Sequence, residues 1–126
     1  MKVVFLDHIV LTVRDLDKTC RFYHEILGMD VIEFDDGRRA LQFGEQKINL
    51  HRTGYLIKPH ANMPTPGSAD LCLITMTPMD EVMEHLREND VPIMEGPVQR
   101  TGAMGQIISV YFRDPDNNLI ELSNYP

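Results

Sequence analysis

Two short stretches decide the fold: Asp-His-Ile-Val-Leu-Thr at residues 7–12 and Ala-Asp-Leu-Cys-Leu-Ile at residues 69–74. Both are rich in apolar residues, and the first is also rich in β-branched residues, which favour strands. Each is followed by apolar residues at helical spacing and then by three more short strand signals. The chain therefore repeats one β-α-β-β-β order, which predicts an α+β fold built from two such modules.

The first module is predicted over residues 1–52. A strand at residues 3–13 leads to Asp15, a residue type that caps helix N-termini, and the helix is predicted to end at Gly28. Turn-forming clusters then separate three strands, predicted at residues 29–34, 39–43 and 47–51.

The second module is predicted over residues 69–126, after a linker at 53–68 that holds three prolines and two glycines. A strand at 69–75 precedes a helix whose predicted N-cap is Thr77, with Pro78 in the first helical position. Further strands are predicted at residues 92–95, 106–113 and 118–123, and the Gly- and Pro-rich residues 96–105 are predicted to form a loop.

Composition excludes several classes of partner. The 126 residues carry 19 acidic and 12 basic side chains, a formal charge of −7, whereas nucleic acids and anionic membranes are bound by basic surfaces. No apolar run approaches the roughly 20 residues of a membrane span, and the first residues do not resemble a signal peptide. Cys20 and Cys72 suggest no disulfide framework. We expect a cytoplasmic protein with a small-molecule or protein partner.

Polar residues occupy matched positions on four strands. Because strand side chains alternate between the two faces of a sheet, each matched strand has an apolar stripe and a second, more polar stripe. Imidazole and carboxylate groups that converge from such stripes are suited to bind a divalent metal. The polar stripes of the matched strands carry His8, Asn49, His51, Asp70 and Glu121.

Three motifs resemble the vicinal oxygen chelate superfamily: residues 6–13, residues 21–29 and the ending Phe-Arg-Asp-Pro-Asp-Asn-Asn-Leu-Ile-Glu-Leu at residues 112–122. That superfamily contains glyoxalase I, bleomycin-resistance proteins and extradiol dioxygenases. Residues 67–72 and 95–102 are most similar to small glyoxalase-domain-containing proteins. The resemblance implies one domain over residues 1–126, a glyoxalase-like half-barrel with a mixed eight-stranded sheet and flanking helices.

The resemblance also implies a divalent metal ion: Mn, Mg, Fe, Ni or Zn. His8 and Glu121 match typical family ligands, whereas Asp70 stands where the family usually has His. Asn49 stands where glyoxalase I has Glu, and His51 lies two residues further on the same face, so either could be the fourth ligand. Two carboxylates with one imidazole favour a hard ion unless His51 contributes.

The implied activity is that of a metal-dependent lyase or isomerase on a small dicarbonyl or hydroxy-carbonyl substrate, with Glu121 as the catalytic proton carrier. Asn49 cannot accept a proton, so we expect weak or absent lactoylglutathione lyase activity. An extradiol-type dioxygenase and a non-catalytic binding or drug-sequestering protein stay open as alternatives. Substrate contacts are expected from Asn49, from Cys72 and from Arg100 in the predicted loop, and the resemblance implies a homodimer.

Overall fold

A computed structural model describes all of residues 1–126 and divides the chain into two compact units, Met1–Gly67 (unit 1) and Ser68–Pro126 (unit 2). Each unit has the element order β-α-β-β-β, so the predicted α+β fold of two repeated modules is confirmed. Unit 1 contains β1 (His8–Val13), α1 (Leu16–Glu25), β2 (Asp30–Phe34), β3 (Arg38–Phe43) and β4 (Gln46–Arg52). Unit 2 contains β5 (Asp70–Ile74), α2 (Met79–Glu88), β6 (Glu95–Gly102), β7 (Gly105–Arg113) and β8 (Leu119–Asn124).

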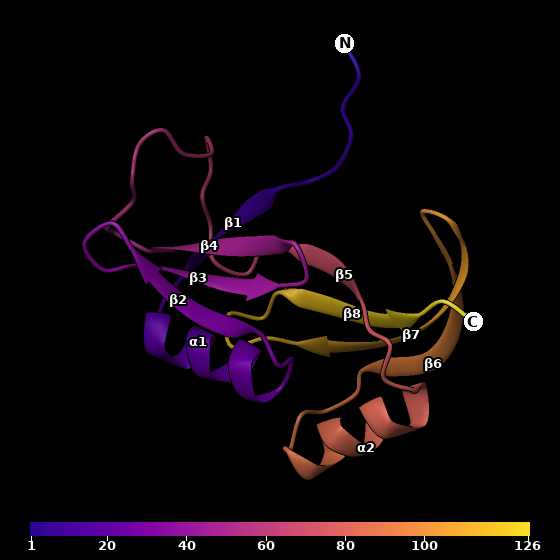
Figure 1. The fold of residues 1–126 in the computed structure, drawn as a ribbon. Coiled ribbons are helices and arrows are strands. Elements are labelled where there is room, and N and C mark those ends of the chain that lie inside the picture. The colour runs from indigo at the N-terminus through magenta and orange to yellow at the C-terminus, as the bar shows by residue number, and fades with distance from the viewer. The chain divides into compact units, whose positions relative to one another are not determined.

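The eight strands divide into two four-stranded mixed sheets, one in each unit (Figure 1). The strand orders are β1-β4-β3-β2 and β5-β8-β7-β6. In each sheet the first strand of the unit pairs in parallel with the last strand, and the other pairs are antiparallel. A parallel pair needs a crossover connection, which in both units includes the helix.

The core of unit 1 lies between α1 and one face of its sheet (Figure 1). Asp15 caps α1 as predicted, because its side chain accepts a hydrogen bond from the backbone N–H of Lys18 at 3.0 Å. Tyr23 on α1 is fully buried, together with Val13 and Leu41 on the sheet. On the same side Arg39 of β3 donates to Asp17 of α1, which links the sheet to the helix.

The core of unit 2 contains Val82 and Leu86 of α2 and the buried strand residues Val110, Phe112 and Ile120. The helix begins one residue later than predicted: Pro78 is its N-cap and Thr77 is not, and no side chain caps it. The Thr77 N–H instead donates to the hydroxyl of Thr75 at 3.1 Å. No helix in the structure is long and apolar enough to span a membrane.

Residues 96–105 do not form the predicted loop: most of them belong to β6, which pairs with β7, and only the turn at its end separates the two strands. Gly and Pro are tolerated because β6 is an edge strand with a bulge between Glu95 and Val98. Gly96 has φ +115°, and a side chain there would lie 2.5 Å from the carbonyl oxygen of Ser109. Glycine is therefore required at position 96, where β6 lies against the backbone of β7.

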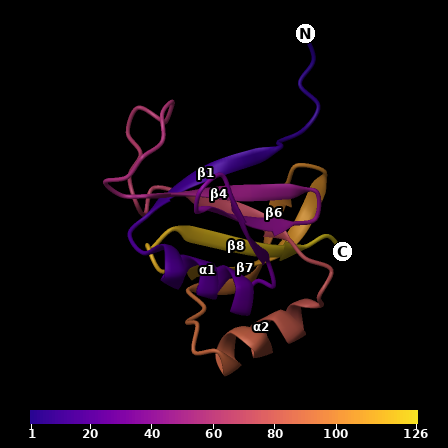
Figure 2. The same ribbon diagram turned by 60° about the vertical axis from the view of Figure 1, so that its left-hand side comes forward.

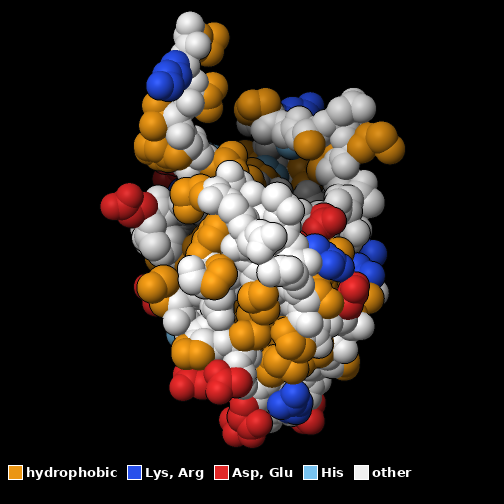
Figure 3. Space-filling view, turned by 90° about the vertical axis from the view of Figure 1, so that its right-hand side faces the viewer, with side chains coloured by type: hydrophobic (Ala, Val, Ile, Leu, Met, Phe, Trp, Pro, Cys, Tyr) orange, Lys and Arg blue, Asp and Glu red, His pale blue; other side chains and the backbone are white.

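The first residues do not extend β1 as predicted; the strand begins only at His8. Residues 1–7 lead away from the sheet of unit 1 in both ribbon views (Figure 2). Gln46 of β4 links this segment to the sheet by donating to the carbonyl oxygen of Leu6 at 3.0 Å. Val3, Val4 and Phe5 are exposed, and Figure 3 shows this arm as a projection that carries hydrophobic side chains.

Candidate functional site

The strand register confirms that each sheet has an apolar face and a polar face. In unit 1, residues Val10 and Thr12 of β1 pair with Asn49 and His51 of β4, and these side chains share a face with His8. We call this the polar face of unit 1. In unit 2, the pairs Asp70 with Leu119, Cys72 with Glu121 and Ile74 with Ser123 define the polar face of unit 2, which also carries Ser109 and Tyr111 of β7.

His8 lies at one end of the polar face of unit 1, with its side chain 43% exposed. Its Nδ1 is 2.7 Å from a carboxylate oxygen of Asp7. With the proton on Nδ1, the ring donates to Asp7 and the lone pair of Nε2 faces outward for a ligand. A carboxylate that orients an imidazole in this way is the usual second partner of a metal-binding histidine. His8 therefore suits the predicted role of metal ligand.

Asn49 and His51 lie further along the same face and are buried, at 7% and 5% exposure. The Asn49 Oδ1 and the His51 Nδ1 are both buried without a hydrogen-bond partner. The pairing of β3 with β4 ends at Arg39 and Leu50, and Arg38 and His51 are the next residues beyond that pair. The Arg38 Nε is also buried without a partner. Burial, followed by the positive charges of Arg38 and His60, lowers the pKa of His51 below its usual 6.5.

The register separates the two predicted histidine ligands of unit 1. His8 pairs with Lys47 and His51 pairs with Thr12, so the two imidazoles are four strand positions apart. At about 3.3 Å per residue this is about 13 Å along the sheet, too far for both to bind one ion. Between the two open alternatives, Asn49 is nearer to His8 than His51 is.

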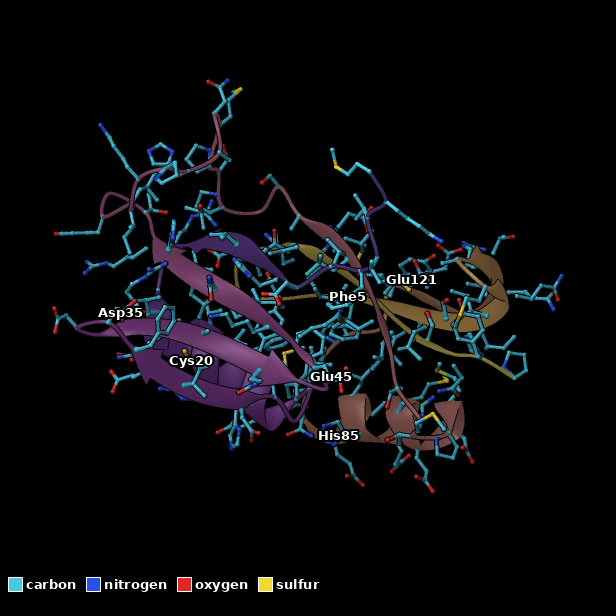
Figure 4. The ribbon with its side chains drawn as sticks, turned by 45° about the horizontal axis from the view of Figure 1, so that its top comes forward. Phe5, Cys20, Asp35, Glu45, His85 and Glu121 are labelled. Carbon is cyan, nitrogen blue, oxygen red and sulfur yellow. The ribbon has the colours of Figure 1, made fainter.

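Glu121 lies on the polar face of unit 2, half-buried on β8 (Figure 4). Its Oε2 accepts a 2.6 Å hydrogen bond from the hydroxyl of Ser109, which is fully buried on the neighbouring strand β7. The Ser109 hydroxyl is in turn 2.7 Å from that of Ser123, also fully buried. The Cys72 sulfur lies 3.5 Å from the Ser123 hydroxyl. These four side chains form what we call the Glu121 chain.

The directions of the hydrogen bonds in the Glu121 chain follow from counting protons. A carboxylate can only accept hydrogen bonds, so the single hydroxyl proton of Ser109 is donated to Glu121. Ser123 must then donate to Ser109, which leaves the Cys72 thiol to donate to Ser123. Burial is the largest influence on the thiol and raises the pKa of Cys72. Cys72 is the exposed end of the Glu121 chain of hydrogen bonds and is not a core residue.

Asp70 and Glu121 stand on neighbouring strands of one face, two strand positions apart. This places their Cα atoms about 8 Å apart, a separation that lets two carboxylates share one ion. No group of three or more His, Cys, Asp or Glu side chains in the structure is placed to hold a metal. His8 and His51 belong to unit 1, and Asp70 and Glu121 to unit 2. Their joint role as ligands therefore stays a prediction.

Arg100 lies on β6 and not in the flexible loop that the sequence predicts. Its Nε donates to the Tyr111 hydroxyl at 3.0 Å, and another guanidinium nitrogen donates to Glu95 at 3.1 Å. These partners raise the pKa of Arg100, and burial is the main cause that raises the pKa of Tyr111. Arg100 is thus held in place within unit 2, and its predicted contact with a substrate stays a prediction.

The sequence pattern identified Asn49, His51, Cys72 and Glu121 but missed Arg38 and Ser109. Arg38 lies beside a turn and resembles any surface arginine in the sequence. Ser109 lies inside an apolar run. The available signal was the alternation of faces along β3 and β7, which becomes useful only when the cross-strand register is known.

The family model of the Glyoxalase/Bleomycin resistance protein/Dioxygenase superfamily matches residues 5–122. Virulence protein STM3117 of Salmonella typhimurium is 54% identical over 120 residues, which cover 95% of this chain and 83% of that protein. Its crystal structure superposes with a TM-score of 0.98 over the whole of both chains.

Two further relatives differ in their similarity. Glyoxalase domain-containing protein RDO1 of Mycosarcoma maydis is 53% identical over 125 residues, 99% of this chain and 70% of that protein. Metallothiol transferase FosB of Staphylococcus epidermidis is 27% identical over 122 residues, 97% of this chain and 82% of that protein. The similarity therefore spans nearly the whole chain. One of the similar proteins is named as a metallothiol transferase.

Proposed function

The chain belongs to the Glyoxalase/Bleomycin resistance protein/Dioxygenase superfamily, and from this membership and the two polar faces we propose that it is a metal-dependent lyase or isomerase. Its substrate would be a small oxygen-rich molecule, a dicarbonyl or hydroxy-carbonyl compound. The name of the related Metallothiol transferase FosB supports a metal in this chain. A homodimer and a cytoplasmic location are further parts of the proposal.

The observation that carries the proposal is the anchoring of Glu121. One of its carboxylate oxygens accepts the 2.6 Å bond from buried Ser109, which fixes the direction of the side chain. Glu121 itself is half-buried, and besides burial its carboxylate also raises the pKa of Tyr111, its cross-strand neighbour on β7, so the two side chains lie close together. A carboxylate whose direction is fixed by a buried donor is suited to bind a cation or to carry a proton.

By their chemistry, the ligands predicted from the sequence would suit a divalent metal. His8 with its Asp7 partner, Asp70 and Glu121 would hold the ion: one imidazole nitrogen and two carboxylates, which favour Mn²⁺, Mg²⁺ or Fe²⁺ over softer ions. The bound ion would polarise neighbouring oxygens of the substrate as a Lewis acid. Glu121 would move a proton between adjacent substrate carbons, while Ser109 keeps the carboxylate oriented.

Efficient glyoxalase I chemistry is not proposed. Asn49 occupies the position matched to Glu121, and its amide oxygen cannot take up a proton at neutral pH. Glu121 is therefore the single carboxylate available for proton transfer, where two matched carboxylates would share it. We expect methylglyoxal with glutathione to be turned over well below the roughly 10 s⁻¹ typical of enzymes.

The alternatives make different demands. An extradiol-type dioxygenase would consume oxygen with catechols and would need iron, for which two histidines and one carboxylate are the usual ligands. A binding or drug-sequestering protein would need no metal. Neither has a specific observation in the two polar faces that favours it over the lyase or isomerase.

The test is an activity screen of the metal-reconstituted protein on small dicarbonyl and hydroxy-carbonyl compounds. Wild type should convert at least one of them in a metal-dependent way, and Glu121→Gln should not. Glu95→Gln is the matched control, because it removes a carboxylate from the same sheet that bonds to Arg100 and not to Ser109. Equal turnover by wild type and Glu121→Gln would contradict the proposal.

A further inference from the structure

The polar face of unit 1 concentrates the hydrogen-bonding groups that this chain leaves unused. Four buried side-chain atoms in the structure have no partner, and three of them lie on this face: Arg38 Nε, Asn49 Oδ1 and His51 Nδ1. A buried polar atom without a partner is costly, and such atoms are rare in folded proteins. Three together on one sheet face indicate that the partner is supplied by another molecule.

The three atoms are close enough to meet one small ligand. Asn49 and His51 are two residues apart on one face of β4, so their Cα atoms lie about 7 Å apart. Arg38 and His51 are the next residues beyond Arg39 and Leu50, the last pair of β3 with β4, and the charge of Arg38 acts on the His51 ring. A ligand of a few heavy atoms can span this arrangement.

The chemistry of the three groups specifies the ligand. The Arg38 guanidinium offers donors, and its Nε–H with a terminal N–H matches the two oxygens of a carboxylate. Its ion-pair partner Asp35 is exposed and 4.0 Å away, so the guanidinium is weakly neutralised, and one of its faces lies over the Phe34 ring at 4.8 Å. The Asn49 Oδ1 only accepts and needs a donor such as a hydroxyl. The neutral His51 ring can donate or accept between them, depending on its tautomer.

We propose that Arg38, Asn49 and His51 form a binding site for a small carboxylate that also carries a hydroxyl group. Arg38 binds the carboxylate, Asn49 accepts the hydroxyl proton, and His51 completes the contact. This inference rests on the proposed function and deepens it, because it names such a molecule as the substrate class. Binding itself requires no metal, so the two can fail separately.

The experiment is a calorimetric titration in EDTA with three probes of similar size: lactate, propionate, which lacks the hydroxyl, and 1,2-propanediol, which lacks the carboxylate. Wild type should bind lactate about tenfold more tightly than propionate, the value of one neutral hydrogen bond, and propanediol least. Lactate and propionate binding equally, or neither binding, would overturn the site.

Variants assign the contacts. Arg38→Met should weaken lactate binding at least tenfold. Arg38→Lys keeps the charge but loses the paired N–H donors of the guanidinium, and should recover only part of this affinity. Arg39→Met is the matched control, since it removes the same charge from the same strand on the opposite face. Asn49→Leu should make lactate and propionate bind alike. Wild-type lactate affinity in either Arg38→Met or Asn49→Leu would contradict the assignment.

A parallel titration with Mn²⁺ separates this inference from the proposed function. Lactate binding that depends on Arg38, in a protein that binds no Mn²⁺, would uphold the carboxylate site and contradict the metal-dependent enzyme. Mn²⁺ binding that depends on Glu121, without any lactate binding, would contradict the carboxylate site alone.

Discussion

The polar faces of the two units have the same strand register but satisfy their polar groups in opposite ways. The pair Asn49 and His51 on β4 corresponds to Glu121 and Ser123 on β8. Across the sheet, Arg38 in unit 1 corresponds to Ser109 in unit 2. In unit 2 these groups bond to one another in the Glu121 chain, whereas in unit 1 each has a buried atom without a partner.

This difference indicates that two modules with the same backbone arrangement can differ in their roles. Short serine side chains allow strands β7 and β8 to hold a carboxylate rigidly, as a catalytic or metal-binding group requires. Large side chains with unpaired atoms leave unit 1 able to gain energy when a ligand arrives. Under the two proposals, unit 2 anchors the carboxylate and unit 1 recognises the ligand.

The largest expected effect comes from removing the anchored carboxylate. At a divalent metal concentration 100-fold above Kd, wild type should gain about 2.7 kcal/mol in unfolding free energy. Glu121→Gln should gain none, because the amide is a poor metal ligand. Thermal melts with Mn²⁺, Ni²⁺ and Zn²⁺ measure the gain, and Glu95→Gln should keep it. A wild-type gain in Glu121→Gln would remove this residue from the predicted ligands.

Next in size is the loss of the central donor of the Glu121 chain. Ser109→Ala should lower the unfolding free energy by about 2 kcal/mol, because Glu121 loses a donor and Ser123 loses an acceptor in a buried place. It should also weaken metal binding about 10- to 100-fold. Urea unfolding and metal titration measure the two effects. The exposed Thr101→Ala should change stability by less than about 0.5 kcal/mol; an equally small change in Ser109→Ala would break the comparison.

The third effect is a pH dependence confined to unit 1. Because burial lowers the pKa of His51 below 6.5, the unfolded chain binds a proton there more readily than the folded chain. His51 should therefore contribute stability that is present above about pH 6.5 and lost as pH falls through that value. The loss is at most about 1.4 kcal/mol per pH unit.

Unfolding in EDTA across the range from neutral to mildly acidic pH measures this dependence. His51→Gln should flatten the pH profile of stability. Ser123→Ala, at the matched position in unit 2, carries no titratable group and should keep the wild-type slope. An unchanged slope in His51→Gln would show that its burial does not disfavour protonation.

The smallest effect has the opposite sign. Asn49→Leu should raise the unfolding free energy without ligand by about 1 kcal/mol, since it removes a buried amide oxygen that has no partner and preserves the side-chain size. Ser109→Ala, which removes a polar group from unit 2, should lower stability instead, so the two substitutions should have opposite signs. A destabilised Asn49→Leu would mean that its amide already contributes to the fold.

Much of the fold could be predicted from the sequence because alternation along the strands and the capping residue Asp15 are local signals. The strand β6 was missed because Gly96 and Pro97 are typical of loops, and only the bulge on an edge strand explains their presence. The faces of Asn49 and Glu121 followed from alternation as well. The roles of Arg38 and Ser109 could not be predicted, because they depend on which residue of a neighbouring strand stands opposite.

The central claim, that this chain is a metal-dependent member of its superfamily, is tested most directly by calorimetric titration. Protein stripped with EDTA would be titrated with Mn²⁺, Ni²⁺ and Zn²⁺ in turn, with Glu121→Gln alongside. Wild type should bind one ion per chain saturably for at least one metal, and Glu121→Gln should bind none. Absence of binding for all three metals, with no shift in melting temperature, would contradict it and favour a metal-free binding protein.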